Sequence, residues 1–262
     1  MSMIQISENI KNRLSTLVIP IVLVFVWQIV TSGGYVSSHF LPSPGTLFHY
    51  TVKLFVEQGF LLHIAVSLKR VLFGFLIGSV TGFLFGLLMG LSKTAEKMLA
   101  PTFHVIRQVP IIGWIPLIVM WCGMTELPRI IIISIAAFYP ITLNTFSGVR
   151  SVSKEYIELG AVYGYKRLKF IRKIVLPAVF PSILTGISLS VGMSWAMLMA
   201  AELFIETFDG IGTRIQLGRE KFNMPLVITG IITVGFLGLV MTLTAEKIAK
   251  VLDRGRAIRK EP

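Results

Sequence analysis

The sequence offers few side chains that could form a catalytic or metal site. The single cysteine, Cys122, has no partner for a disulfide or a metal site, so we assign it a packing role. A hydrolase needs a nucleophile with a base in reach, and a helical zinc site needs two ligands four positions apart. The histidines stand at no such spacing from an Asp, Glu or Cys: they are His39, His49, His63 and His104. We therefore predict that the chain is not an enzyme and holds no metal.

The nearest approach to a phosphate-binding loop is the stretch GLLMGLSKT at residues 86–94. In a true loop of this kind the lysine directly follows the second glycine, where it reaches the phosphates. Here Lys93 is displaced from Gly90, and the stretch lies at the edge of an apolar segment. We predict that the chain has no nucleotide site, so that ATP hydrolysis, if it is coupled to this chain, must come from another polypeptide.

A secondary transporter or channel is the main alternative function, because it uses ionisable groups at membrane depth to bind or relay ions. The candidates are Glu202 and Arg107, which stand near the ends of two apolar stretches. Glu202 is not clearly at the midplane. The alternative stays open on these residues, and transport that requires ATP would exclude it.

A charged segment interrupts the apolar chain at residues 155–183, which read EYIELGAVYGYKRLKFIRKIVLPAVFPSI. Apolar residues recur at helical spacing on both sides of Gly164, so we expect two short amphipathic helices with this glycine at their junction. Glycine can take the left-handed conformation that ends one helix and redirects the chain. Five cations follow and can sit at an anionic headgroup surface: Lys166, Arg167, Lys169, Arg172 and Lys173.

The composition indicates that the helices that carry these residues lie in a membrane. The 262 residues are 54% hydrophobic and 15% charged, with a mean hydropathy of +0.77. A membrane-crossing helix takes about 20 apolar residues. We place six spans at residues 17–31, 71–91, 109–123, 128–149, 183–205 and 225–245, and thus expect an all-α membrane protein. The net charge of +12 does not indicate a nucleic-acid partner, because the cations lie between spans rather than along one polar face.

The distribution of charge also predicts the orientation. With six spans both termini share a side, and most of the 25 lysines and arginines fall on that side. The positive-inside bias therefore predicts cytoplasmic termini in a bacterial inner membrane. Lys11 and Arg13 precede the first apolar run as in a signal peptide, but no convincing cleavage site follows, so we expect a retained anchor.

Turn-forming residues divide the chain. Glycines and prolines between residues 31 and 63 precede a mildly amphipathic stretch at 47–61, which we interpret as an external connector with a short surface helix. We expect residues 1–62 to form an N-terminal helix and connector. Residues 63–250 would form a five-span core with a cytoplasmic loop at 150–176, and residues 251–262 a basic cytoplasmic tail.

Glycines and prolines mark two further features of the core. Five glycines follow at intervals of four residues, which places them along one stripe of the second span: Gly74, Gly78, Gly82, Gly86 and Gly90. Such a stripe favours close helix packing in lipid, with a substrate-lining role as the alternative. Pro110, Pro116 and Pro140 oppose regular helix in the third and fourth spans. Broken helices of this kind border transport pathways, and they also occur as plain kinks.

The charged segment resembles the cytoplasmic loop of ABC importer permeases, the membrane components of binding-protein-dependent transport systems. That loop has a Glu, small residues, a Gly six positions after the Glu, and then Ile-x-Leu-Pro. The corresponding residues here are Glu158, Ala161, Gly164, Ile174, Leu176 and Pro177. One departure is Leu159-Gly160, where the motif has alanines. Four stretches resemble the nitrate, sulfonate and taurine branch: AVSLKRVLFGFLIG, RQVPIIGWIPLIVMWCG, LNTFSGVRSV and SWAMLMAAELFIETFDGIG.

The resemblance implies the fold of a type I ABC importer permease with six transmembrane helices. In the family the loop forms a coupling helix that docks on an ATP-binding subunit. Its expected contact residues here are Glu158, Ala161, Tyr163, Gly164, Ile174, Leu176 and Pro177. The implied assembly is two copies of this chain, two ATP-binding subunits that use ATP and Mg, and an external solute-binding protein.

Position and resemblance together suggest residues that meet the solute: Pro110, Trp114, Trp121, Tyr139, Asn144, Ser194, Trp195 and Glu202. The alternative for the tryptophans is interfacial anchoring, and for Asn144 and Ser194 hydrogen bonding between helices. Asp209, Gly210 and Gly212 suggest a tight external turn where the solute-binding protein docks, with a plain solvated loop as the alternative. We expect a sulfonate or taurine-like solute, with nitrate, bicarbonate and a thiamine-pyrimidine precursor left open. The cations of the chain are mostly cytoplasmic and do not argue for an anion.

Overall fold

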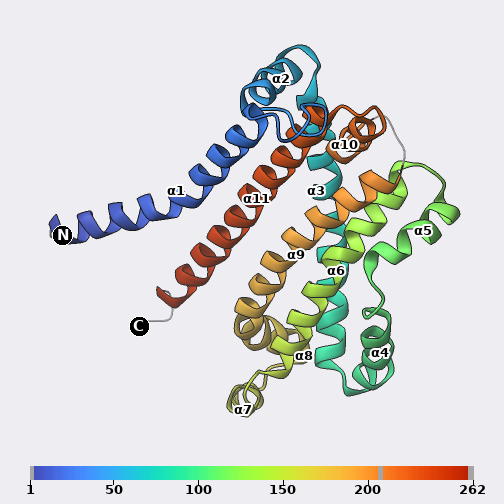
Figure 1. Ribbon diagram of the computed structural model, residues 1–262. Helices are drawn as coiled ribbons and strands as arrows, with labels where there is room; N and C mark the ends of the chain where they lie inside the picture. Colours follow the sequence, from blue (N-terminus) through green and yellow to red (C-terminus); the bar gives the residue numbers. More distant parts are fainter. Residues whose placement is uncertain (1–2, 206–208, 259–262) are drawn as a thin grey trace. The chain divides into compact units, whose positions relative to one another are not determined.

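The computed structural model describes residues 3–205 and 209–258, and helices dominate it (Figure 1). No β-strand occurs in these ranges, in agreement with the all-α class. The first elements are α1 (Met3–Ser32), α2 (Pro44–Glu57), α3 (Phe60–Leu91), α4 (Lys93–Ile106), the 3-10 helix η1 (Ile111–Trp114), α5 (Ile115–Cys122) and α6 (Glu126–Arg150). The remainder are α7 (Lys154–Val162), α8 (Arg167–Phe170), the π-helical turn η2 (Ile171–Val175), α9 (Leu176–Phe204), α10 (Ile211–Glu220) and α11 (Met224–Ile258).

The chain divides into two compact units. The smaller unit holds Met1–Leu61 and Arg214–Ile232, and the larger holds Leu62–Thr213 and Thr233–Pro262. The domain boundaries expected from the sequence stay a prediction, and residues 259–262 of the expected basic tail lie outside the described residues.

Four helical segments are long and apolar enough to cross a membrane: Phe60–Leu91, Glu126–Arg150, Arg167–Phe204 and Met224–Asp253. A fifth crossing would combine Lys93–Ile106 with Ile111–Cys122, two segments that meet at an angle of 86°. The apolar part of α1, Val18–Ser32, is shorter than these spans. The spans expected at 71–91, 128–149, 183–205 and 225–245 thus coincide with long apolar helices.

The third expected span, residues 109–123, is not one continuous helix. Pro110 is the N-cap of η1, and Pro116 lies in the first turn of α5. Proline has no backbone N–H to donate, so it fits the start of a helix, where that group has no partner, and costs a hydrogen bond in a helix interior. The two prolines therefore begin short helices instead of kinking one long helix. Pro140, by contrast, lies within α6, which continues through it as one helix, so the break expected in the fourth span does not occur.

The glycine stripe of α3 is a packing surface in the larger unit. A Cβ atom at Gly74 would lie 2.6 Å from Ile133 Cβ, and one at Gly90 would lie 2.6 Å from Val149 Cβ. At Gly78 an added Cβ would overlap the carbonyl oxygen of Ser134. Five glycines thus let the backbones of α3 and α6 approach along the length of both helices. This confirms the packing interpretation of the stripe.

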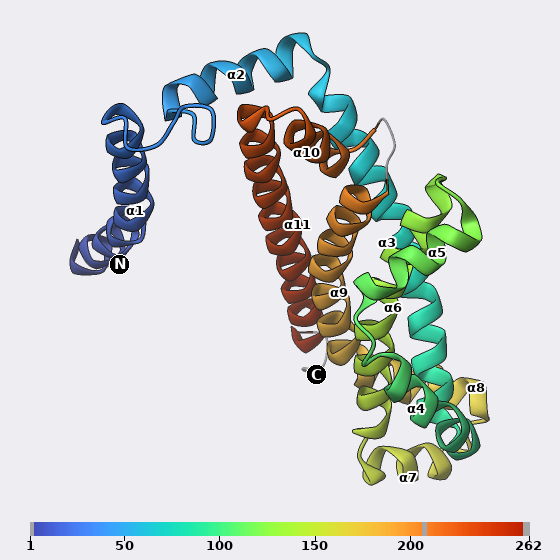
Figure 2. The ribbon, with the colours of Figure 1, turned by 45° about the vertical axis from the view of Figure 1, so that its right-hand side comes forward.

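Helices α6 and α9 run side by side in both views of the larger unit (Figures 1 and 2). Gly148 of α6 faces Val179 and Ser182 of α9, where a Cβ atom would lie 2.7 Å from the valine side chain. The two views also place α4, α7 and α8 at one end of this unit, near the end of α3 and the start of α9. The opposite end holds the start of α6 and the end of α9.

The smaller unit contains the helix expected in the connector. Ser43 caps α2 by accepting a hydrogen bond from the backbone N–H of Thr46, and Pro44 occupies the first turn. Buried Leu47 and Leu54 give α2 an inner face. Its Tyr50 hydroxyl accepts a hydrogen bond of 2.9 Å from the Asn223 side chain, which ties the connector to the start of α11.

Candidate functional site

The segment between α6 and α9 is bent at Gly164, the glycine expected at the junction of two short helices. Helix α7 ends at Val162, and Gly164 follows with φ of 62°. The N–H of Tyr165 donates to the Gly160 carbonyl at 3.0 Å, and the N–H of Tyr163 donates to the Leu159 carbonyl at 3.1 Å. A bond from the third residue after the helix, Tyr165, back to the last turn is the Schellman arrangement, which requires the left-handed conformation at the residue before it, Gly164. Gly164 therefore turns the chain sharply into α8.

Close packing at Gly160 fixes the angle of this bend. A Cβ atom there would lie 2.6 Å from the ring of Phe170 in α8 and 2.9 Å from Ile174 Cδ1 in η2. The position thus needs a very small residue, and glycine at the place of a motif alanine meets that need. Ile174 is buried, while Leu176 and Pro177 are partly buried at the start of α9. The Ile-Val-Leu-Pro run joins the bend directly to a membrane span.

Several apolar side chains on the outer surface of the bend are exposed. Val162 is 83% exposed, Tyr163 65% and Leu168 80%. The Tyr163 ring stacks on the Tyr165 ring at 5.7 Å. Glu158 of α7 is exposed as well. Ala161 belongs to α7, and its side chain lies outside the described part of the chain.

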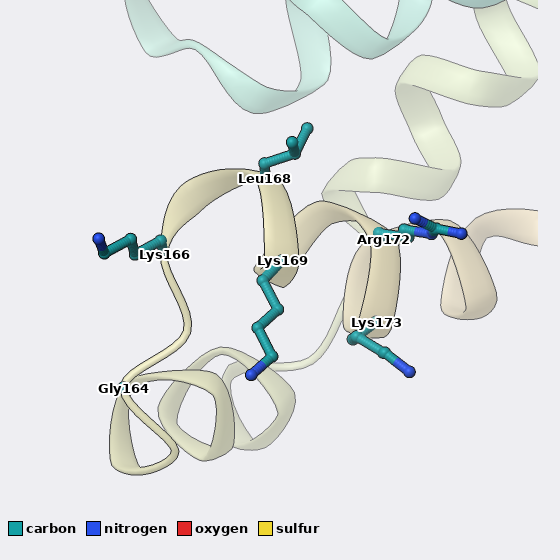
Figure 3. A pocket seen from close by; sticks show the side chains of 6 residues that line it. All are labelled: Gly164, Lys166, Leu168, Lys169, Arg172 and Lys173. Atoms are coloured by element: carbon teal, nitrogen blue, oxygen red, sulfur yellow. The ribbon is translucent and has the colours of Figure 1, made fainter.

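A basic groove of about 730 Å³ lies beside the bend (Figure 3). Its lining residues are Gly164, Lys166, Leu168, Lys169, Arg172 and Lys173. Lys169 Nζ lies 4.8 Å from the centre of the Tyr165 ring, a cation–π contact. At the start of α7 a hydrogen bond with Ser153 lowers the pKa of Glu155, so its carboxylate stays charged at neutral pH. The bend therefore presents a negative helix start and a positive groove.

A second cavity, of about 520 Å³, brings together three of the residues expected along a solute pathway. They are Pro110, Tyr139 and Asn144, contributed by the bend before η1 and by α6. Leu189, Met193 and Met197 of α9 form part of the apolar wall, and the remaining lining residues are Arg107, Val109, Ile111, Ile112, Pro140 and Leu143. We call this cavity the central groove. It lies between segments that cross the membrane.

The other expected pathway residues do not line the central groove. Trp114 packs against the apolar cluster around Ile115 and Ile132, and Trp121 is 69% exposed. Ser194 is fully buried. Trp195 is buried as well, and its Nε1 donates to the Val234 carbonyl of α11 at 3.1 Å. Their role in transport stays a prediction.

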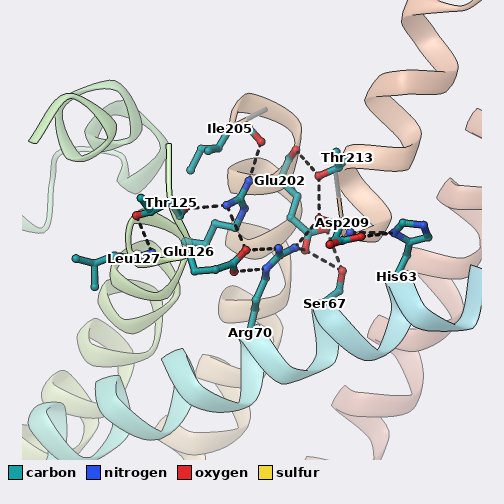
Figure 4. Close-up of polar contacts among 12 residues, drawn as sticks. His63, Ser67, Arg70, Thr125, Glu126, Leu127, Glu202, Ile205, Asp209 and Thr213 are labelled. Carbon is teal, nitrogen blue, oxygen red and sulfur yellow. Dashed lines mark hydrogen bonds and ion pairs between the residues drawn. The ribbon is translucent and has the colours of Figure 1, made fainter. Parts of the chain in front are cut away.

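Glu202 belongs to an ionic network at the opposite end of the larger unit (Figure 4). Its carboxylate accepts a hydrogen bond of 2.8 Å from Arg70 Nη1 and one of 2.8 Å from Ser67 Oγ, both in α3. Arg70 also donates through Nε and Nη2 to the two oxygens of Glu126, each at 2.6 Å. Arg129, which is fully buried, donates to the Ile205 carbonyl at 2.9 Å. The network joins α3, the start of α6 and the end of α9.

The turn at residues 209–212, where docking was expected, closes this network through its backbone. The Gly212 N–H donates to Glu202 Oε2 at 2.8 Å, and the Ile211 N–H donates to Ser67 Oγ at 3.0 Å. Gly210 has φ of 122°, and a Cβ there would lie 2.6 Å from Glu202 Oε1. The side chain of Asp209 is about half exposed and lies 3.8 Å from His63. The amides of this turn thus face inward, and docking stays a prediction for its outer side.

Sequence reasoning did not find Ser67, Arg70, Glu126 or Arg129. A signal was present, because Ser67 and Arg70, like Glu126 and Arg129, stand three positions apart on one helix face within or beside an apolar span. Charged groups at such positions are costly unless they are paired. No group of three or more metal-ligand side chains occurs among the described residues.

Comparisons with known proteins agree with this architecture. Residues 78–258 match the family described as binding-protein-dependent transport system inner membrane component. A Bacillus subtilis protein named as an aliphatic sulfonates transport permease is 35% identical over 238 residues, which cover 91% of this chain and 84% of that protein. The taurine transport system permease protein of Escherichia coli is 30% identical, over 94% of this chain and 90% of that protein. The bicarbonate transport system permease protein of Synechococcus elongatus is 29% identical, over 88% of this chain and 87% of that protein.

Two solved structures share the fold at lower identity. A chain of the inward-facing MetNI methionine ABC transporter has a TM-score of 0.58 at 15% identity and covers 72% of this chain and 95% of its own length. A chain of an amino acid ABC transporter crystallised with histidines has a TM-score of 0.58 at 20% identity, with 77% and 97% covered.

Proposed function

Because the chain belongs to the family of binding-protein-dependent transport system inner membrane components, we propose that it is the permease subunit of an ATP-driven importer of a small sulfonate or taurine-like solute. In this proposal two copies of the chain form the path through the membrane. Two ATP-binding subunits drive it with ATP and Mg, and an external binding protein delivers the solute. Nitrate, bicarbonate and a thiamine-pyrimidine precursor are the other solutes to test.

The bend at Gly164 is the observation that carries the proposal. A soluble subunit can move a membrane bundle only through a rigid projection, since rigid-body motion is transmitted through packed elements. The contacts of Gly160 with Phe170 and Ile174 fix α7 to α8 and η2, which lead directly into α9. Val162 and Tyr163 remain exposed there for a partner to cover. A soluble loop with no partner would have little reason to expose them.

The relatives support the solute class. They are named for aliphatic sulfonates, taurine and bicarbonate, all small solutes that carry an acidic group. The apolar groove with a few polar groups is consistent with a passage that alternates its access to the two sides, while the binding protein sets the affinity. Cytoplasmic termini follow in this proposal, because the bend must face the ATP-binding subunits.

Reconstitution tests the function. We expect proteoliposomes that contain this chain and its ATP-binding subunit to take up radiolabelled taurine or butanesulfonate only when ATP, Mg and the binding protein are supplied. Liposomes with the chain alone are the control. Uptake by the chain alone, without the ATP-binding subunit, would show instead that it works as a secondary transporter or channel.

A further inference from the structure

Arg107 lies at the break between α4 and η1, on the edge of the central groove. Arg107 ends α4, where its backbone N–H donates to the Phe103 carbonyl at 3.1 Å. The chain then turns before η1 begins at Ile111, and the axes of the two helical segments differ by 86°. Irregular backbone at membrane depth is stable only where protein buries it or where it borders a water-filled cavity. Arg107 and Pro110 from this break both line the groove.

Arg107 is the one charged residue that lines the central groove in the described part of the chain. Its guanidinium makes no hydrogen bond or ion pair with the described residues, in contrast to Arg70 and Arg129 in the ionic network around Glu202. Arg107 is exposed rather than buried, so a ligand that enters the groove can reach its guanidinium. Its attraction for an anion is also stronger beside apolar walls than in water.

Two neutral groups of α6 complete a polar side of the groove. Asn144 donates one amide hydrogen from Nδ2 to the Pro140 carbonyl at 2.8 Å, which leaves a second hydrogen for another acceptor. Tyr139 brings a hydroxyl to the same groove. A guanidinium, an amide hydrogen and a hydroxyl can all donate to an oxyanion. Leu189 and Met193 of α9 supply apolar surface to the same groove.

We propose that Arg107 binds the anionic group of the solute during its passage, and that Asn144 and Tyr139 supply further hydrogen bonds. This rests on the proposed importer function and adds that the permease itself selects for a sulfonate or carboxylate group. The planar guanidinium can donate two parallel hydrogen bonds to such a group. Arg107 is thus a specificity-determining residue, and the apolar wall accommodates the rest of a small solute.

Charge rescue in the reconstituted complex tests the inference. The probes are radiolabelled taurine, butanesulfonate and bicarbonate, with the ATP-binding subunit and binding protein present. We expect Arg107→Gln to lower the maximal uptake rate about tenfold or more, as for loss of a hydrogen bond to a charged group. Arg107→Lys should retain most of the rate. Because the binding protein sets the affinity, the concentration for half-maximal uptake should change little.

A cysteine variant distinguishes loss of the positive charge at position 107 from a defect in folding, because the charge can be restored chemically in the same protein sample. In a Cys122→Ser background, the Arg107→Cys variant is treated with an aminoethyl, a methyl or a sulfonatoethyl methanethiosulfonate reagent. We expect only the aminoethyl reagent, which restores a positive charge, to restore uptake. Equal uptake by wild type and Arg107→Gln, or equal rescue by the methyl reagent, would overturn the role of Arg107. Absence of ATP-dependent uptake of every probe by wild type would instead count against the proposed function.

Discussion

Arg70 Nη1 lies 2.8 Å from Glu202 Oε1, and the two side chains are 5% and 0% exposed. The pair joins α3 to the last turn of α9. Arg70 also binds both oxygens of Glu126 at the start of α6, so three helices meet at one guanidinium. Removing one member of such a network leaves buried donors without their acceptor, which costs more than the bonds themselves contribute. The network thus specifies how these helix ends assemble.

We expect Glu202→Ala to lower the free energy of unfolding by about 3–5 kcal/mol, because Ser67, Arg70 and the Gly212 amide all lose their acceptor. Glu202→Gln should cost less, since it keeps an acceptor oxygen. The measurement is the apparent Tm of the purified protein in detergent, with an expected drop of about 6 °C or more for the alanine variant.

An exposed ion pair of the same chain provides the control. Arg150 and Glu96 form an ion pair whose side chains are 59% and 28% exposed. Exposed pairs contribute less than about 1 kcal/mol. Glu96→Gln should therefore leave the apparent Tm nearly unchanged. Equal effects of Glu96→Gln and Glu202→Ala would contradict the structural role of the buried network.

Much of the membrane architecture follows from local patterns in the sequence. The four long apolar helices could be predicted from length and hydropathy, because a span must satisfy its backbone internally over a fixed thickness. The left-handed turn at Gly164 could also be predicted, since a glycine between two amphipathic helices has few other roles. Both depend on residues that are neighbours in the chain.

What could not be predicted depends on contacts between distant residues. Arg70 and Glu126 are 56 positions apart, and Ser67 and Glu202 are 135 positions apart. Spacing along one sequence does not show which helices meet. The 86° turn after α4 is a further case, because Pro110 and Pro116 indicate a break but not its angle. The bonds from the Gly212 amide to Glu202 and from the Ile211 amide to Ser67 are another case, while docking at the outer side of this turn stays a prediction.

The close approach of α3 and α6 leads to a second prediction. Gly78→Leu should force these helices apart, because an added Cβ would overlap the Ser134 carbonyl, and overpacking typically costs about 1–3 kcal/mol. The matched control is Gly235→Leu in α11, where an added Cβ meets nothing within 4 Å. The yield of monodisperse protein and its apparent Tm should fall for Gly78→Leu alone. A similar loss in the control would point to a general intolerance of leucine in these helices.

The exposed acid of α7 leads to a third prediction. Glu158→Lys should weaken assembly with the ATP-binding subunit, because a charge reversal on a docking surface removes any pairing and adds repulsion. The amount of that subunit that co-purifies with the tagged permease measures the effect. Glu57→Lys, at an exposed position of α2, serves as the control. Undiminished co-purification of the Glu158 variant would exclude this residue from the contact.

The bend itself gives the fourth prediction. Gly164 has φ of 62°, and a Cβ atom there would meet nothing within 4 Å. A side chain therefore fits in the available space, and its only cost is the left-handed backbone. That cost is about 1–2 kcal/mol for an ordinary residue and larger for a β-branched one. We expect Gly164→Val to reduce ATP-dependent uptake and binding-protein-stimulated ATP hydrolysis by about 5- to 30-fold, the population change that such a cost implies.

Asparagine separates backbone strain from the mere presence of a side chain at this position. Asn tolerates the left-handed conformation better than other residues that have a Cβ, so Gly164→Asn should keep most of the coupled activity. Both variants should insert into the membrane in normal amounts, because Gly164 lies outside the long apolar helical segments. If valine and asparagine reduce uptake equally, the surface of the bend matters rather than its conformation. If neither reduces it, the bend does not transmit the motion of the ATP-binding subunit.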